Sequence, residues 1–341
     1  MASTVDSFWC TSVAIVGTEI ATFSVFGLQL TKGQHDTIIV AANTIVDTHS
    51  LLMIRLPCSQ EYNIHRLTGE PCSDIPYQKN NTVMLIDVHT HLDQYPGDEI
   101  LAILERAVLA GVNYVVVAGT TIASSQAIVN LATHNPHVFA SVGIHPTEIQ
   151  SSPSRALMNE LSVIASTPEV IAISEVGLDY PAPKELQEAQ IDAFSSQIRL
   201  GLELNLPIIY HSRNAYPDTL DILKAEDAQA VGGIAHYFQG TIETAYRCIE
   251  LGFLISLAKP LLYLEGLRTV AKEIPLKHIV LETDSHPQPF KKNREKWTEP
   301  KLLLEIAQTL AEIKQTSVQE VIDITTANAL DKLKLREADR T

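Results

Sequence analysis

The sequence predicts a closed barrel of eight parallel strands surrounded by helices, with a small extension before it. From Val83 onward, apolar runs of β type alternate with helical stretches, and this alternation is typical of a parallel sheet. Eight such units extend over about 250 residues, the usual size of a β/α barrel. The 341-residue chain has an ordinary globular composition, 45% hydrophobic and 19% charged.

Each expected element follows from the apolar pattern. The expected strands are Met84–His89, Tyr114–Gly119, Val138–Ile144, Val170–Val176, Pro207–His211, Gly233–Tyr237, Phe253–Leu257 and His278–Glu282. The expected helices include Glu99–Leu109, Arg155–Ala165, Leu186–Leu204, Thr241–Leu251, Leu264–Lys272, Lys301–Lys314 and Val318–Leu330. A doubly wound open sheet is the alternative, but it would usually carry a Gly-rich phosphate loop after its first strand. That position holds His89-Thr90-His91.

Residues 1–82 differ from the rest of the chain and contain no catalytic motif. Short β-branched stretches at Val13–Val16, Ala21–Leu30, Thr37–Ala41 and Leu51–Leu56 favour strands. We therefore expect a mainly-β or partly disordered extension of unknown role at 1–82, followed by the barrel domain at 83–341. A protein partner could bind through this extension.

Charge and hydropathy narrow the function classes. The net charge of −15 argues against a protein that covers nucleic acid through its own positive charge. It does not argue against a site where bound metal ions supply the positive charge. The four cysteines have no close C-x-x-C spacing, so a zinc knuckle or redox motif is not expected. No apolar run reaches membrane-spanning length, and the N-terminus lacks signal-peptide features. We expect a cytoplasmic protein without a membrane partner.

Polar side chains recur where the expected strands end, and in a barrel these ends share one edge. The recurring residues are His89, His91, His145, Glu175, His211, Arg213, His236 and Asp284. One histidine or aspartate at a strand end is more often a hydrogen-bonded core residue or a helix cap. Six strand ends with such residues predict a metal site, since imidazole is a common ligand for divalent transition metals.

These residues lie in motifs that resemble the TatD family of metal-dependent hydrolases, best known as deoxyribonucleases, among the amidohydrolase-like barrels. The resemblance covers residues 83 to about 333. Its motifs are Ile86-Asp87-Val88-His89-Thr90-His91-Leu92-Asp93, Val142-Gly143-Ile144-His145-Pro146, Ser174-Glu175-Val176-Gly177-Leu178-Asp179-Tyr180, Leu206-Pro207-Ile208-Ile209-Tyr210-His211-Ser212-Arg213, His236-Tyr237-Phe238-Gln239-Gly240 and Leu281-Glu282-Thr283-Asp284.

The resemblance implies two divalent cations, of zinc, manganese or magnesium. His89, His91, Glu175 and Asp284 would hold one cation, while Glu175, His211 and His236 would hold the other, with Glu175 bridging. Glu175 and Asp284 would be the catalytic residues, and Asp284 could accept the proton of the attacking water. His145 and Arg213 would contact the substrate.

The expected reaction is phosphodiester hydrolysis, with DNA as the substrate of a DNase or exonuclease. The alternatives are a hydrolase of small amides, esters or lactones on the same barrel, or a catalytically weak barrel acting as a binding subunit. The chain departs from the family pattern at Ser174, where glycine is usual, and at Thr147, where a second histidine is frequent. A basic loop, Lys291, Lys292, Arg294 and Lys296, follows Asp284; it is either solvated or guides a polyanion.

Overall fold

The computed structural model describes residues 84–181, 183–291 and 293–335, together with the backbone of five strands between residues 9 and 57. The chain divides into two compact units, Met1–Gln78 and Lys79–Thr341. The strands of the first unit are β1 (Trp9–Val16), β2 (Glu19–Phe26), β3 (Leu28–Lys32), β4 (Thr37–Ala42) and β5 (Leu52–Pro57). Antiparallel pairing joins β1 to β2, and joins β4 to both β3 and β5. These strands coincide with the stretches that the sequence favours, except that residues 21–30 belong to two strands instead of one.

The second unit is the predicted barrel, with eight parallel strands in sequential order. They are β6 (Leu85–Thr90), β7 (Val112–Ala118), β8 (Val138–Val142), β9 (Val170–Asp179), β10 (Ile208–Arg213), β11 (Gly233–Ala235), β12 (Phe253–Leu257) and β13 (Ile279–Leu281). The barrel closes where Thr90 forms a parallel bridge with Ser285. There the Asp284 amide donates to the His89 carbonyl at 3.0 Å, so chain closure itself places two of the predicted site residues side by side.

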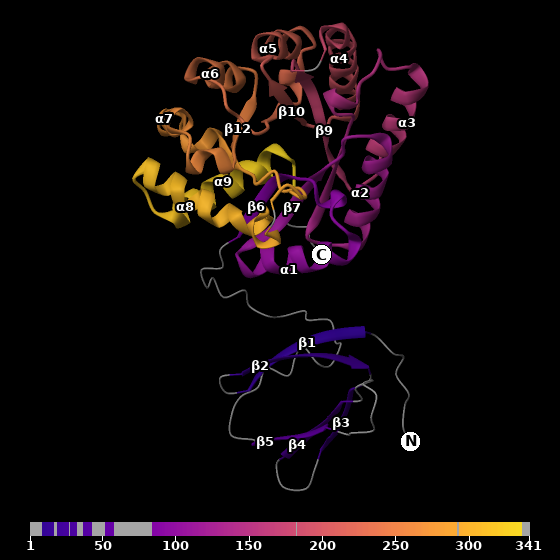
Figure 1. The fold of residues 1–341 in the computed structure, drawn as a ribbon, viewed down its shortest axis with the longest axis vertical. Coiled ribbons are helices and arrows are strands. Elements are labelled where there is room, and N and C mark those ends of the chain that lie inside the picture. Colours follow the sequence, from indigo (N-terminus) through magenta and orange to yellow (C-terminus); the bar gives the residue numbers. More distant parts are fainter. Residues whose placement is uncertain are drawn as a thin grey trace. The chain divides into compact units, whose positions relative to one another are not determined.

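Helices surround the strands (Figure 1). They are α1 (Gly97–Leu109), α2 (Ile122–His134), α3 (Arg155–Ala165), α4 (Gln187–Leu204), α5 (Tyr216–Ala225), α6 (Ile242–Glu250), α7 (Glu265–Glu273), α8 (Leu303–Lys314) and α9 (Val318–Lys332). Helices α2 and α5 are not among those whose bounds the sequence outlined. The first turns of α2 contain small polar residues, and α5 begins at a Tyr-Pro pair, so the apolar pattern is weak at both. Among the residues that the structure describes, no helix is long and apolar enough to cross a bilayer.

Two hydrophobic cores support the barrel. Inside it, one buried residue from nearly every strand packs with its neighbours, including Val116, Ile209 and Val280. Ala329 and Leu333 of α9 join this cluster, and the hydroxyl of Thr326 donates to the carbonyl of Met84 just before β6. Helix α9 therefore covers the amino-terminal end of the barrel, which leaves the opposite end for the site. The larger core lies between the strands and the surrounding helices.

Gly177 in β9 allows a close approach to β10. Its φ is +134°, and a Cβ at this position would overlap the carbonyl oxygen of His211. Because His211 is a predicted site residue, a side chain here would displace both the strand and the site.

Gly177→Ala is therefore expected to lower the free energy of unfolding by at least about 2 kcal/mol, through backbone strain and the steric clash. Denaturant unfolding measures this loss. The matched control is Gly266→Ala in α7, where no atom lies within 4 Å of the added Cβ and stability should be unchanged or slightly higher. Equal stability of the two variants would contradict this account of Gly177.

A candidate metal centre at the mouth of the barrel

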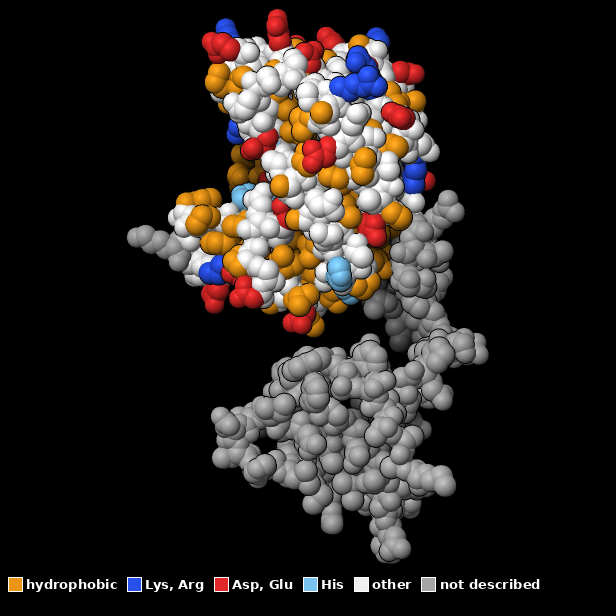
Figure 2. Space-filling model, turned by 90° about the vertical axis from the view of Figure 1, so that its right-hand side faces the viewer, with side chains coloured by type: hydrophobic (Ala, Val, Ile, Leu, Met, Phe, Trp, Pro, Cys, Tyr) orange, Lys and Arg blue, Asp and Glu red, His pale blue; other side chains and the backbone are white. Residues whose placement is uncertain are grey.

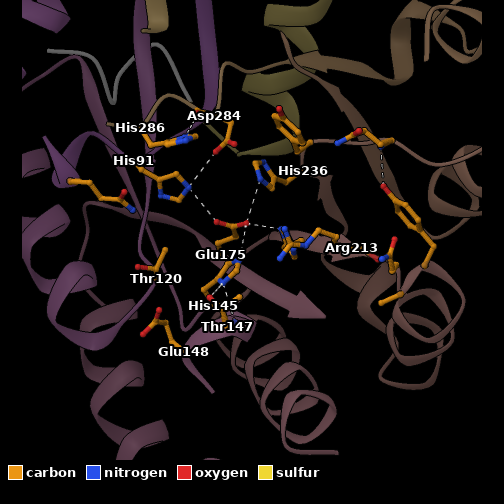
Figure 3. A pocket seen from close by; sticks show the side chains of 18 of the residues that line it. His91, Thr120, His145, Thr147, Glu148, Glu175, Arg213, His236, Asp284 and His286 are labelled. Carbon is orange, nitrogen blue, oxygen red and sulfur yellow. Dashed lines mark hydrogen bonds and ion pairs between the residues drawn. The ribbon is translucent and has the colours of Figure 1, made fainter. Parts of the chain in front are cut away.

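A cavity of about 910 Å³ opens at the carboxyl ends of the strands. Seven of the eight predicted site residues line it: His91, His145, Glu175, His211, Arg213, His236 and Asp284. The eighth, His89, is fully buried, and its ring stacks on that of His236 with 3.6 Å between centroids. The structure therefore brings all of the predicted site residues together. Figure 3 labels six of them around the cavity: His91, His145, Glu175, Arg213, His236 and Asp284.

The buried carboxylate of Glu175 lies at the centre of this group, and its two oxygens face different imidazoles (Figure 3). Oε2 lies 3.4 Å from Nε2 of His89 and 3.3 Å from Nε2 of His91. Nε2 of His91 is also 3.4 Å from Oδ1 of Asp284. His89, His91 and Glu175 are close enough together to hold one metal ion, with Asp284 at its side.

The other oxygen of Glu175, Oε1, faces three more imidazoles. It lies 3.0 Å from Nδ1 of His211, 3.4 Å from Nε2 of His236 and 3.3 Å from Nε2 of His145. Glu175, His211 and His236 form a second group able to hold a metal ion. One carboxylate thus belongs to two ligand groups, as a bridging ligand between two cations would.

Electrostatics favour the ionised form of both central carboxylates. Burial raises the pKa of Glu175, but the charges and hydrogen bonds of the surrounding imidazoles, with His145 foremost, together outweigh burial and hold the pKa well below its usual value. Burial likewise raises the pKa of Asp284, but the hydrogen bond from His91 and the charges of the surrounding imidazoles together outweigh burial and hold this pKa below its usual value. Both groups are therefore anionic near neutral pH, which is the form that binds a cation.

Oxygen atoms lie at the far side of two rings whose Nε2 faces Glu175. Nδ1 of His91 lies 3.2 Å from the carbonyl oxygen of Ala118, and a carbonyl can only accept. Nδ1 of His236 lies 2.9 Å from Oε1 of Glu282. Nδ1 of His91 therefore carries a proton, so that its Nε2 is left to offer a lone pair, an arrangement found around metal-binding histidines.

His89 provides the most direct test of whether a metal fits. Neither of its ring nitrogens has a hydrogen-bond partner within the described part of the chain, although the side chain is fully buried. A buried polar atom without a partner costs about 1–3 kcal/mol. An ion beside Glu175 would satisfy Nε2 of His89, so the residues present fit a metal.

Asp179 is a site residue whose role we did not predict. Its carboxylate lies 3.1 Å from Nε2 of His211 and 2.8 Å from Nη2 of Arg213. Arg213 pairs with Asp179 in the register of β9 and β10. Burial lowers the pKa of His211, but the hydrogen bonds with Asp179 and Glu175 outweigh it and raise the pKa to about 9. Asp179 thus orients a predicted ligand and holds Arg213 at the cavity wall.

Glu282 lies against the far nitrogen of His236, as Asp179 lies against that of His211. It is fully buried and accepts hydrogen bonds from the Ser256 hydroxyl at 2.6 Å and the Tyr237 amide at 2.7 Å. Burial raises its pKa to about 8 in spite of these bonds. Asp179 and Glu282 both lie within the sequence motifs. The feature of the sequence that could have identified them as site residues is a carboxylate at the end of a buried strand.

Asp87 positions Asp284 through the residue between Glu282 and Asp284. Its carboxylate accepts from the amide of Thr283 at 2.9 Å and from the hydroxyl of Thr283 at 2.5 Å. Asp284 itself has a φ of +52°, a left-handed conformation that aspartate tolerates better than most residues. The carboxylate of Asp284 is thereby held at the cavity wall.

The basic loop after Asp284 is less free to guide a polyanion than its charge suggests. Arg294 pairs with Glu99 and with Glu299, and lies 4.5 Å from the ring centroid of Trp297. Lys291 donates to the side chain of Gln288. These contacts tie the loop to α1, while Lys292 lies outside the described residues.

A sequence model of the TatD related DNase family matches residues 86–334. This match covers more than half of the chain. The chain belongs to the TatD related DNase family. The resemblance predicted from the six motifs is therefore confirmed.

Known TatD proteins and their relatives match this chain over most of their own lengths. The uncharacterized metal-dependent hydrolase YabD of Bacillus subtilis is 36% identical over 255 residues, which cover 72% of this chain and 97% of YabD. The 3'-5' ssDNA/RNA exonuclease TatD of Citrobacter rodentium is 33% identical over 244 residues, covering 68% of this chain and 89% of that protein. The crystal structure of YjjV, a TatD homologue from Escherichia coli K12, matches with a TM-score of 0.69 and 25% identity, covering 75% of this chain and 100% of that chain.

Two departures from the TatD pattern have clear positions in the structure. Ser174 is fully buried next to Glu175, and its hydroxyl has no hydrogen-bond partner among the described residues. Thr147 lines the cavity and contacts the ring of His145. Neither departure removes a predicted ligand from this TatD family site.

Proposed function

We propose that this chain is a metal-dependent hydrolase that cleaves phosphodiester bonds in DNA, with two divalent cations of zinc, manganese or magnesium as cofactors. The observation that carries the proposal is the environment of Glu175, whose two oxygens serve two separate groups of imidazoles. His89, His91, Glu175 and Asp284 would hold one cation. Glu175, His211 and His236 would hold the second.

Bound cations would supply positive charge for the scissile phosphate and lower the pKa of the attacking water. The side chains of the protein then perform two tasks. The Asp284 carboxylate, ionised and at the cavity wall, accepts the proton of that water. Glu282 and Asp179 lie against one nitrogen of His236 and His211, respectively, and hold each ring with its other nitrogen toward Glu175.

Several features support a nucleic acid end as the substrate. The cavity wall is rich in polar groups, including Thr120, Asn214 and Gln239, which suit a phosphate and sugar better than an apolar ligand. Acidic and basic side chains are both scattered over the face of the barrel in Figure 2, and the basic ones form no continuous stripe. Contacts confined to a cavity fit a chain that enters by its end better than they fit a long duplex lying across the surface. The C. rodentium relative acts on single-stranded DNA and RNA as an exonuclease.

Metal binding is expected to release protons. Burial lowers the pKa of His211 and its carboxylate partners raise it to about 9, so the metal-free ring is protonated at pH 7. A cation takes the place of that proton, and affinity should therefore rise with pH up to about 9. Calorimetric titration of the metal-free protein at pH 7, in two buffers of different ionisation enthalpy, measures the release. A heat that does not depend on the buffer would contradict this expectation.

The proposed reaction is tested by a substrate panel on the metal-reconstituted protein. The panel contains single-stranded DNA labelled at either end, duplex DNA, RNA, a simple ester, a lactone and a small amide. We expect single-stranded DNA to be cleaved stepwise from one end and the reaction to stop in excess chelator. Turnover of only the ester, lactone or amide would favour the small-molecule hydrolase. Metal binding without any turnover would favour a binding subunit.

A further inference from the structure

Tyr237 has an unusual backbone conformation beside the metal centre. Its φ is +46°, a left-handed value that is an outlier for a bulky side chain. Hydrogen bonds hold the chain in this conformation, because the Tyr237 amide donates to the buried Glu282 at 2.7 Å and the Phe238 amide donates to the Ser256 carbonyl at 3.1 Å. Strained residues of this kind cluster at functional sites, where the surrounding structure maintains them.

The half-buried ring of Tyr237 forms part of the cavity wall. Its centroid lies 5.7 Å from that of His236. Burial raises the pKa of Tyr237 and the charge of Asp284 raises it further, so Asp284 is also close. Figure 3 shows His236 and Asp284 above Glu175, with His145 below it. A nucleotide whose phosphate lies in this cavity would bring its base within reach of the Tyr237 ring.

A second aromatic side chain, Tyr263, lies in the neighbouring loop. Strands β11 and β12 are adjacent in the barrel, and Tyr263 directly follows the 3-10 helix Lys259–Leu262 after β12. Pro260 in that helix is buried and its carbonyl accepts from the Tyr263 amide at 3.1 Å, whereas Tyr263 itself is 64% exposed. After burial and Asp284, the charge of Tyr263 is the next cause of the raised pKa of Tyr237, so the two tyrosines lie near each other.

Two neighbouring aromatic rings, one at the cavity wall and one in solvent, suit a flat aromatic ligand. Every nucleobase has a π face, and stacking on aromatic side chains is a common way for proteins to hold unpaired bases. A duplex covers these faces with neighbouring base pairs, whereas a single strand can expose them. Stacking also supplies affinity without positive charge, which suits a chain whose net charge is −15.

We propose that Tyr237 and Tyr263 form a stacking site for an unpaired nucleobase next to the metal centre, and that this site favours single-stranded substrates without selecting the base. The inference deepens the proposed phosphodiester hydrolysis and rests on it for the class of ligand. Both tyrosines act in binding, and neither takes part in bond cleavage. Loss of either ring should therefore raise KM for a single strand and leave kcat nearly unchanged.

Four variants test the stacking site by fluorescence anisotropy. The probe is a labelled single-stranded DNA oligonucleotide with phosphorothioate linkages, which resist cleavage, and the protein is loaded with Mn²⁺. Tyr237→Leu and Tyr263→Leu remove a ring but keep an apolar side chain, and each should weaken binding by about 5- to 100-fold. Tyr237→Phe keeps the ring and should bind like the wild type. Tyr246→Leu is the matched control, because Tyr246 is 44% exposed on the surrounding helix α6, and it should also bind like the wild type.

An abasic residue moved along the oligonucleotide separates stacking from a structural effect. Near one end of the strand, loss of the base should weaken binding to the wild type by a similar factor. The same loss should affect Tyr237→Leu and Tyr263→Leu much less, as expected for groups that interact.

Equal binding of abasic and intact strands at every position would overturn the proposal. Normal binding by Tyr263→Leu would also overturn it, as would a defect in Tyr237→Leu that is undiminished with the abasic strand. If elemental analysis shows that Tyr237→Leu has lost metal, the comparison with Tyr263→Leu, whose side chain is exposed, decides.

Failure of the proposed function has a different signature. In that case ordinary DNA would not be cleaved with any metal, while the dependence of binding on the base would still decide whether the tyrosines stack. Cleavage of single-stranded DNA without any dependence on the base would overturn the stacking site alone.

Discussion

Glu175→Gln is expected to lose turnover by about 10⁴-fold, a loss like that of a central member of a catalytic group. The amide has nearly the shape of the carboxylate, but it carries no charge and is a poorer ligand. Because each oxygen of Glu175 faces a different set of imidazoles, one substitution weakens both cation sites. Metal analysis should therefore show less than one equivalent per chain, while the fold, followed by circular dichroism, persists.

The matched control is Glu148→Gln. Glu148 lines the same cavity, but it is exposed and belongs to none of the candidate ligand groups. It should keep near-normal turnover and full metal content. If Glu148→Gln lost as much as Glu175→Gln, the effect would reflect the general charge of the cavity and not a bridging carboxylate.

Asp284→Asn is expected to lower kcat by about 10³-fold, within the range attributed to a general base. The asparagine can take the left-handed backbone conformation of Asp284, so the barrel closure should survive. The group formed by Glu175, His211 and His236 lacks Asp284, and at least one equivalent of metal should therefore remain bound.

Asp323→Asn provides the control, because this exposed aspartate lies on α9, which covers the opposite end of the barrel. Its turnover and metal content should equal those of the wild type. Near-normal turnover of Asp284→Asn would show that the proton of the attacking water goes elsewhere.

The predicted fold and the grouping of the site residues share one physical basis. The apolar runs identify parallel strands, and parallel strands place their carboxyl ends on one edge. His89, Glu175 and Asp284 could therefore be grouped from sequence although they lie far apart in the chain. The structure places their side chains around one cavity, as expected.

The roles of Asp179 and Glu282 could not be predicted in the same way. Asp179 meets Arg213 because of the register between β9 and β10, which shifts between Ile208 and Tyr210. Apolar patterns do not report such a shift. Strand ends were also approximate, since β11 stops at Ala235 and leaves His236 in the following turn. The charge of the loop after Asp284 gave no sign that Arg294 pairs with Glu99 in α1.

The proposed phosphodiester hydrolysis would depend on two cations, held by two groups of residues that share Glu175. The most direct measurement is the rate of cleavage of end-labelled single-stranded DNA while metal-free protein is titrated with Mn²⁺. We predict no cleavage without metal, and a rate that rises until two equivalents per chain are bound and then remains constant. Full cleavage in excess chelator, with metal content confirmed as nil, or a maximum reached at one equivalent, would contradict this account.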